Sequence, residues 1–137
     1  MRFLAWHVGQ FLAVPTEKGR SPIVEDARTV EADNAILVFA NFEKGDEPHQ
    51  TEIVTKAANE IASVAANLKV TSIVLNPFVH LFGEPSTPES AVSMLKMLDE
   101  SLTARGLQVQ RLAFGMFYEL ELKAKGHRFS RIARKIE

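Results

Sequence analysis

The chain has 137 residues, 46% of them hydrophobic, which is enough for one compact core. Its 16 basic and 17 acidic residues nearly cancel, which excludes a general attraction to nucleic acid, so any RNA contact must be local. Cysteine is absent, which excludes disulfides and zinc–thiolate sites and fits a cytoplasmic protein. The longest apolar run, 35–40, is far shorter than the roughly 20 residues that span a bilayer, so no membrane contact is expected.

The first forty residues predict strands separated by an irregular segment. The start of the chain is typical of a strand and not of a signal peptide, because no small-residue cleavage pattern follows it. Two apolar pieces, 2–8 and 11–14, flank Gly9-Gln10 and predict a strand pair with a tight connection. Residues 15–34 lack periodicity and predict an irregular, mobile segment, whereas the hydrophobic run 35–40 predicts a central strand.

The middle of the chain predicts two helices that alternate with strands. Apolar residues from Ile53 to Leu68 recur with the spacing of one helical face. The β-branched run 70–75 predicts a strand that ends before Pro77. Thr87 and Gly106 are typical residues for the start and end of the second helix. Its predicted buried residues are Ala91, Val92, Leu95, Leu98 and Leu102.

The last third of the chain predicts two more strands, 107–110 and 118–125, with a bend at Phe114-Gly115 between them. There is no repeat, low-complexity tract or linker. The predicted fold class is therefore α/β, with one compact domain over residues 1–137, a mixed β-sheet and two main helices.

No familiar catalytic or phosphate-binding motif occurs in the chain. The four histidines, at positions 7, 49, 80 and 127, are too scattered to predict a metal site. Residues 76–81 follow a strand and precede a helix, a place where α/β folds commonly bind ligands. The alternative is that Pro77 only ends the strand and that Phe78 and Leu81 fill the core.

Two other segments are candidates for binding. In residues 114–118, a glycine would let a ligand approach the backbone, and aromatic rings could stack on a base. The alternative is a kinked core strand, since Phe117 and Tyr118 point to opposite faces unless the strand is bulged. On a helix, Arg128, Arg131 and Arg134 would form one cationic face for RNA phosphates or for solvent.

Several short motifs occur in a specific order along the chain. They are Met1-Arg2 with His7, Glu43-Lys44 after the central strand, Pro77-Phe78-Val79-His80-Leu81, Arg105-Gly106, Phe114-Gly115 and Lys125-Gly126-His127. In this order they resemble the amino-terminal editing domain of archaeal threonyl-tRNA synthetases. The resemblance implies a fold like that of D-aminoacyl-tRNA deacylases, usually a homodimer, which acts without a metal or cofactor.

The resemblance also implies roles for individual residues. His80 is the expected catalytic side chain, and the expected substrate pocket consists of Phe42, Pro77, Phe78, Val79, Phe114, Gly115, Phe117 and Tyr118. The expected tRNA contacts are Lys44, Lys125, Arg128 and Arg131. The chain departs from the family at two places. Tyr118 stands where the family has a pocket lysine, and Arg131 stands where it has a glutamate.

The implied reaction is the hydrolysis of serine wrongly esterified to threonine tRNA. Serine lacks one methyl group of threonine, which is worth only about 1–3 kcal/mol of discrimination, so a second pocket that excludes threonine is needed. The expected partners are the acceptor end of tRNA(Thr) carrying serine and the catalytic part of the synthetase, in cis or in trans. A D-aminoacyl-tRNA deacylase and a non-catalytic tRNA-binding or assembly module remain alternatives.

Overall fold

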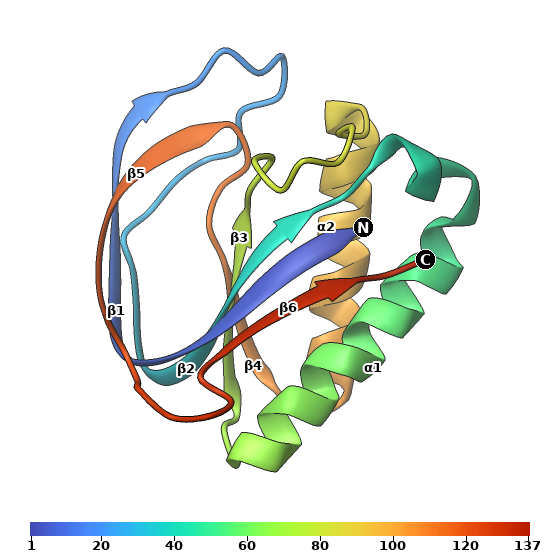
Figure 1. The fold of residues 1–137 in the computed structure, drawn as a ribbon. Coiled ribbons are helices and arrows are strands. Elements are labelled where there is room, and N and C mark those ends of the chain that lie inside the picture. The colour runs from blue at the N-terminus through green and yellow to red at the C-terminus, as the bar shows by residue number, and fades with distance from the viewer.

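The computed structural model describes residues 1–137 as six strands in one mixed sheet, with two α-helices packed against it (Figure 1). In chain order the elements are β1 (Arg2–Lys18), β2 (Val30–Asn41), the 3-10 helix η1 (Lys44–His49), α1 (Gln50–Leu68), β3 (Ser72–Pro77), α2 (Pro88–Ala104), β4 (Gln108–Arg111), β5 (Met116–Ala124) and β6 (Arg131–Lys135). The predicted α/β fold class, with a mixed sheet and two main helices, is confirmed. Neither helix has both the length and the apolar composition that a membrane span requires.

The sheet has the strand order β4-β3-β2-β1-β5, and β6 also pairs with β1. β2, β3 and β4 are parallel, so α1 and α2 are the crossover helices between them. The hydrophobic run 35–40 lies in β2, which is the central strand, as predicted. The carboxyl end of β3 therefore opens at the edge where ligands commonly bind in such folds.

β1 is one continuous strand, so the predicted strand pair around Gly9-Gln10 is wrong. Both apolar pieces pair with β2 in a single register. The register with β5 shifts between Val8 and Gln10, so Gly9 lies at a bulge that bends the strand and does not reverse it. Of the predicted irregular segment 15–34, only residues 19–29 lie outside β1 and β2.

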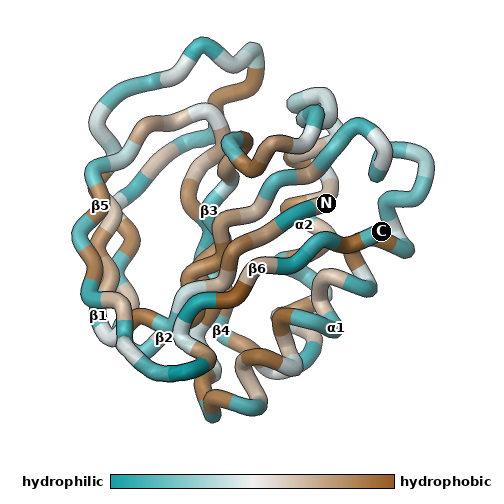
Figure 2. Tube along the Cα trace, viewed as in Figure 1, coloured by the Kyte–Doolittle hydropathy of each residue, from teal (hydrophilic) through white to brown (hydrophobic).

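Two hydrophobic cores lie on opposite faces of the sheet. The larger contains 22 buried residues between the sheet and the helices, and hydrophobic segments gather there on the strands and helices (Figure 2). The smaller contains 8 buried residues, among them Phe11, Leu37 and Leu112, on the face that the helices leave uncovered. In α2, Leu95, Leu98 and Leu102 are buried as predicted, together with Met94, whereas Ala91 and Val92 are half-buried.

The predicted ends of α2 are confirmed. The hydroxyl oxygen of Thr87 accepts a hydrogen bond from the Ser90 backbone N–H at 3.3 Å. Gly106 follows the helix with a φ of +83°. This fixed start places the loop between β3 and α2, residues 78–87, across the carboxyl end of the sheet.

The basic C-terminal segment is a strand, so the idea of a cationic helix face there is wrong. Ile132 and Ile136 are four residues apart, a spacing that suits a helix as well as every second position of a strand. The segment forms a strand because its backbone pairs with the free edge of β1 at residues 2–6. Arg131 and Arg134 consequently lie on opposite sides: Arg131 packs 5.6 Å from the centre of the Trp6 ring, and Arg134 bonds Glu60 at 2.8 Å.

Candidate functional site

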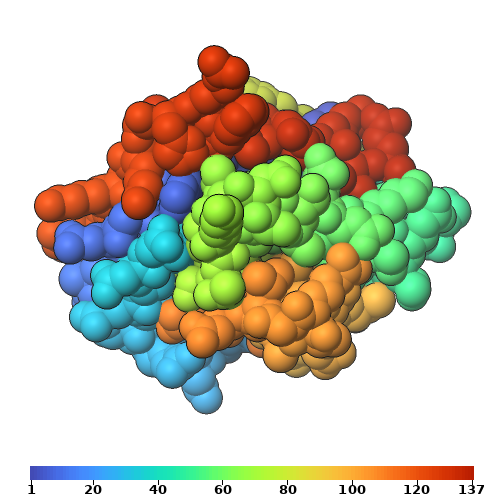
Figure 3. Space-filling model, turned by 90° about the horizontal axis from the view of Figure 1, so that it is seen from below, coloured from blue at the N-terminus to red at the C-terminus, as the bar shows by residue number.

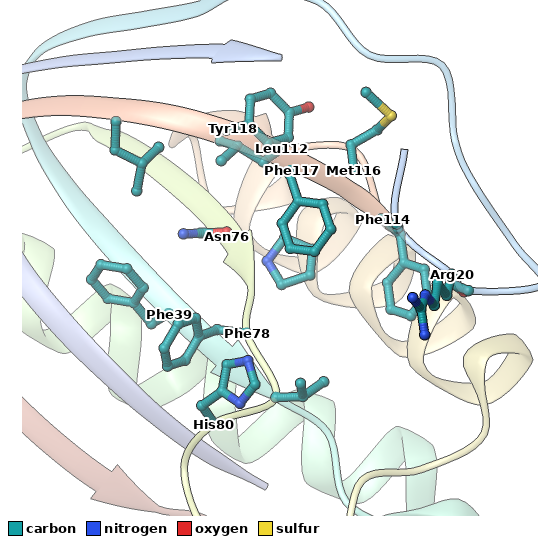
Figure 4. A pocket seen from close by; sticks show the side chains of 16 residues that line it. Arg20, Phe39, Asn76, Phe78, His80, Leu112, Phe114, Met116, Phe117 and Tyr118 are labelled. Carbon is teal, nitrogen blue, oxygen red and sulfur yellow. The ribbon is translucent and has the colours of Figure 1, made fainter. Parts of the chain in front are cut away.

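A cavity of about 410 Å³ opens where β3 ends and β5 begins. Its walls come from residues 76–80, from residues 112–120, and from residues 19–21 at the start of the irregular segment 19–29, which we call the strap. Figure 4 shows the first two walls facing each other across the opening. The two stretches that the sequence singled out, after β3 and around the aromatic bend, therefore share one cavity within a single chain.

All but one of the predicted pocket residues line this cavity. They are Pro77, Phe78, Val79, Phe114, Gly115, Phe117 and Tyr118, together with the predicted catalytic residue His80. Phe42 is the exception, because its ring is buried in the larger core beneath the helices. It follows the end of β2, and its position there faces the helical side of the sheet, opposite the cavity.

His80 is exposed at the cavity, and its ring packs edge-on against Phe78 with a centroid distance of 5.3 Å. Phe78 in turn packs against Phe39 at 5.4 Å, and Phe39 against Trp6 at 5.5 Å. This row of rings fixes the side of His80 that faces the protein. Both ring nitrogens of His80 lack a hydrogen-bond partner within the chain and are free for a ligand.

The loop that carries His80 is attached to the end of β2. The backbone N–H of Phe78 donates to the Ala40 carbonyl oxygen at 2.9 Å, and the N–H of Ser86 donates to the Phe42 carbonyl at 3.0 Å. A Cβ at Gly83 would overlap the carboxylate of Glu43, which forms an ion pair with Arg2. Only glycine lets the loop approach this ion pair so closely.

The aromatic bend needs Gly115 for two reasons. Its φ is +81°, a conformation that side chains disfavour, and a Cβ there would overlap the Ile23 carbonyl oxygen of the strap. The strap is bonded to the bend at its first residue and again at Glu25. The N–H of Gly19 donates to the Gly115 carbonyl at 2.7 Å, and the N–H groups of Glu25 and Phe114 donate to the Phe114 carbonyl and the Glu25 carboxylate, each at 3.0 Å.

Phe117 and Tyr118 both line the cavity, although they are neighbours on one strand. The pairing of β1 with β5 shifts register between Pro15 and Glu17, opposite these two residues. The extra residue at this shift, Thr16, lies on β1 and not on β5, so the predicted bulge in the strand that carries both rings is not what brings them to the cavity. The hydroxyl oxygen of Tyr118 accepts a hydrogen bond from the backbone N–H of Ala113 at 2.7 Å, which ties β5 to the segment before the bend.

We expect Tyr118→Phe to lower the free energy of unfolding by about 1 kcal/mol, because the partly buried N–H of Ala113 loses its acceptor. Urea denaturation of both proteins measures this difference. An unchanged midpoint and slope would mean that the hydroxyl does not hold the bend.

None of the four predicted tRNA-binding residues lines the cavity. Lys44 forms an exposed ion pair with Glu84 at 3.3 Å, and Arg131 packs on Trp6. Lys125 and Arg128 lie on the turn between β5 and β6, at the other end of the sheet (Figure 1). Seen from below in Figure 3, this turn lies on the same face as the C-terminal end of α1.

The cavity also contains residues that the sequence did not single out. From the strap come Gly19, Arg20 and Ser21, and from the strands come Phe39, Leu112 and Leu120. Asn76 and Met116 also line the cavity and lie within the predicted candidate segments 76–81 and 114–118, although they were not among the predicted pocket residues. The strap residues lack any periodic pattern, so no sequence signal connects them with positions near 115.

Two other histidines form a separate hydrogen-bonded chain. The N–H of Phe129 donates to Nδ1 of His127 at 3.2 Å, which leaves the Nε2 hydrogen of His127 to donate to Nδ1 of His7 at 2.9 Å. Nε2 of His7 then donates to the side-chain oxygen of Asn34 at 2.8 Å. With these partners the two histidines hold the β5–β6 turn against β1 and β2. The structure contains no group of three or more His, Cys, Asp or Glu side chains that could hold a metal ion.

The sequence profile of one protein family, the archaea-specific editing domain of threonyl-tRNA synthetase, matches residues 1–136. The chain belongs to this family. Membership of an editing-domain family of a tRNA synthetase supports a proofreading role for this chain in translation. The mixed sheet with two helices is consistent with the D-aminoacyl-tRNA deacylase-like fold that the resemblance implied.

The relatives of this editing domain are archaeal threonine–tRNA ligases. The enzyme of Methanobrevibacter smithii is 37% identical over 123 residues, which cover 87% of this chain and 20% of the relative. The enzyme of Methanothrix thermoacetophila is 35% identical over 127 residues, or 93% of this chain and 20% of the relative. That of Thermococcus kodakarensis is 35% identical over 119 residues, or 87% and 19%. The chain thus spans about a fifth of the length of these relatives.

Proposed function

We propose that residues 1–137 act as one editing domain that hydrolyses the ester between serine and tRNA(Thr). The observation that supports this most is the cavity itself, in which the loop after β3 and the aromatic bend enclose about 410 Å³. This volume lies within the roughly 300–1,000 Å³ of small-ligand sites. The ring of His80 is the polar group on the cavity that is both unpartnered and able to donate or accept a proton.

The proposed reaction uses water and the RNA itself. A water oxygen attacks the ester carbonyl carbon, the bond from that carbon to the ribose oxygen breaks, and the ribose oxygen takes up a proton. Free serine and uncharged tRNA are the products. The vicinal ribose hydroxyl lies beside the carbonyl and helps to position the water, while the cavity and His80 hold the ester in place. No metal or cofactor takes part in this scheme.

The position of Tyr118 supports a scheme without a charged base. Its hydroxyl is already engaged by the backbone of Ala113, so it does not take over the role of a lysine. No aspartate or glutamate lines the cavity either. Arg131, at the second departure from the family, packs on Trp6 outside the cavity.

We propose that selectivity for serine comes from the apolar walls of the cavity. Pro77, Phe114 and Phe117 line the cavity, and in a pocket that fits serine the extra methyl group of threonine would be overpacked, which typically costs about 1–3 kcal/mol. We therefore expect seryl-tRNA(Thr) to be hydrolysed at least about 10-fold faster than threonyl-tRNA(Thr).

Incubation of the protein with seryl-, threonyl- and D-aminoacyl-tRNA, each compared with buffer alone, tests this proposal. Loss of the seryl ester with the threonyl ester spared is the expected result. Equal turnover of the seryl and threonyl esters would contradict the proposed selectivity of the cavity for serine. Preferential loss of the D-aminoacyl ester would instead identify a D-aminoacyl-tRNA deacylase.

A second candidate function is a non-catalytic tRNA-binding or assembly module. The replacement of the family's lysine by Tyr118, whose hydroxyl is engaged, favours this candidate. It predicts tRNA binding that weakens with salt, without loss of ester from any charged tRNA. Salt-dependent contacts of Lys44, Lys125, Arg128 and Arg131 with the acceptor stem belong to both candidates.

The proposal includes the setting in which the domain works. We infer a cytoplasmic homodimer that acts on tRNA(Thr) beside the catalytic part of threonyl-tRNA synthetase, in cis or in trans. Exposed apolar side chains support a surface for a second copy, because Val79 and Phe117 at the cavity are exposed by 50% and 60% and Phe82 is fully exposed.

A further inference from the structure

The strap brings one arginine to the cavity. Among the 16 lining residues, Arg20 is the one with a permanent charge, since no lysine, aspartate or glutamate is present. Figure 4 places Arg20 beside Phe114, across the cavity from Phe39, Phe78 and His80. The positive charge therefore lies on one side of the cavity, opposite Phe39, Phe78 and His80.

The charge of Arg20 has no partner within the chain. Several other arginines are neutralised, as Arg2 pairs with Glu43, Arg111 with Asp99 at 3.0 Å, and Arg134 with Glu60 at 2.8 Å. Arg20 forms no such pair, and its side chain is exposed. An unpaired guanidinium beside a surface without carboxylates attracts an anion.

The backbone that carries Arg20 is held in place. Gly19, directly before Arg20, donates its N–H to the carbonyl oxygen of Gly115 at 2.7 Å. Ile23, three residues after Arg20, packs its backbone against the same glycine. The main chain at Arg20 is thus fixed on the bend, and only the side chain must be ordered when a ligand binds. This lowers the entropic cost of an arginine contact.

We propose that Arg20 binds the phosphate group that joins the terminal nucleoside of the charged RNA to the rest of the strand. A guanidinium can donate two parallel hydrogen bonds to phosphate oxygens, which fixes both the position and the orientation of the phosphate. The terminal nucleoside and its ester then lie between Arg20 and the aromatic wall with His80. This inference rests on the proposed function and adds a contact at the strap for the last phosphate of the strand, separate from the proposed acceptor-stem contacts on the distant β5–β6 turn.

The test compares two substrates that differ in this phosphate. One is seryl-tRNA(Thr), and the other is 2′(3′)-O-seryl-adenosine, which has the ester and nucleoside but no phosphate. We expect Arg20→Ala to lower kcat/KM for seryl-tRNA(Thr) about 10-fold or more, chiefly through KM, and to leave hydrolysis of seryl-adenosine within twofold of wild type. Arg20→Lys should recover part of the loss, since it keeps the charge without the bidentate geometry.

Arg28→Ala is the matched control, because Arg28 is also exposed and unpaired in the strap but does not line the cavity. It should leave both substrates unaffected. An equal loss on both substrates with Arg20→Ala, or no loss on either, would overturn the phosphate contact.

A binding measurement separates this inference from the proposed reaction. Titration of the protein with adenosine 5′-monophosphate and with adenosine should show tighter binding of the monophosphate, and Arg20→Ala should abolish the difference. If the wild-type protein hydrolyses neither ester, the proposed function fails, while this difference still tests Arg20. Equal binding of both ligands by the wild-type protein would refute the role of Arg20.

Discussion

Gly115→Ala is expected to lower the free energy of unfolding by about 3 kcal/mol and to displace the strap from the cavity. The positive φ of this residue costs any other side chain about 1–2 kcal/mol. In addition, the new Cβ would overlap the Ile23 carbonyl oxygen and meet Val24 Cα at 3.2 Å, and backbone atoms cannot give way as a flexible side chain can. Urea denaturation measures the loss of stability.

Gly106→Ala is the control that isolates the overlap. Gly106 also has a positive φ, of +83°, but no atom lies within 4 Å of the position of its Cβ. It should therefore cost only about 1–2 kcal/mol and leave the cavity intact. Equal losses of stability in the two variants would show that the strap moves away from Gly115 without cost.

His80→Ala is expected to reduce hydrolysis of seryl-tRNA(Thr) by about 100-fold with little change in stability. The imidazole is the unpartnered polar group that lies against the row of rings at the cavity, and removal of one oriented polar group from an acyl-transfer site typically costs about 100-fold or more. Since the side chain is exposed, its loss leaves the free energy of unfolding within about 0.5 kcal/mol of wild type. Single-turnover rates and urea denaturation measure the two effects.

His49→Ala provides the comparison, because His49 is an exposed histidine at the start of α1 and does not line the cavity. It should hydrolyse the ester at the wild-type rate. If His80→Ala is as active as His49→Ala, His80 takes no part in the reaction, and the cavity acts through its shape and the RNA alone.

Much of the fold could be predicted because its signals are local. The hydrophobic run in β2, the apolar face of α1 and the cap residue Thr87 are each patterns within one short stretch of the sequence. The course of β1 could not be predicted in the same way. A glycine in a strand indicates a bend as well as a turn, and only the pairing of β1 with β2 over its two apolar pieces decides between them.

The site could be predicted in part, for the same physical reason. Pro77 to His80 and Phe114 to Tyr118 are short motifs that each carry their own signal, and the structure brings them together. Arg20 reaches the cavity only because Gly19 bonds to Gly115, a contact between residues almost a hundred positions apart. The burial of Phe42 likewise depends on the tertiary structure, because its side chain after the end of β2 points to the helical face of the sheet.

β1 pairs along one edge with β6 at residues 2–6 and with β5 from residue 8 onward. While the chain is being synthesised, this edge stays unpaired until β5 and β6 have left the ribosome, because residues 2–18 pair there with residues 116–135. The nascent chain therefore exposes a free strand edge and the uncovered ring of Trp6 to other newly made proteins. A slow late step of folding, and binding by chaperones before that step, are the expected results of pairing β1 with strands that lie far from it in the sequence.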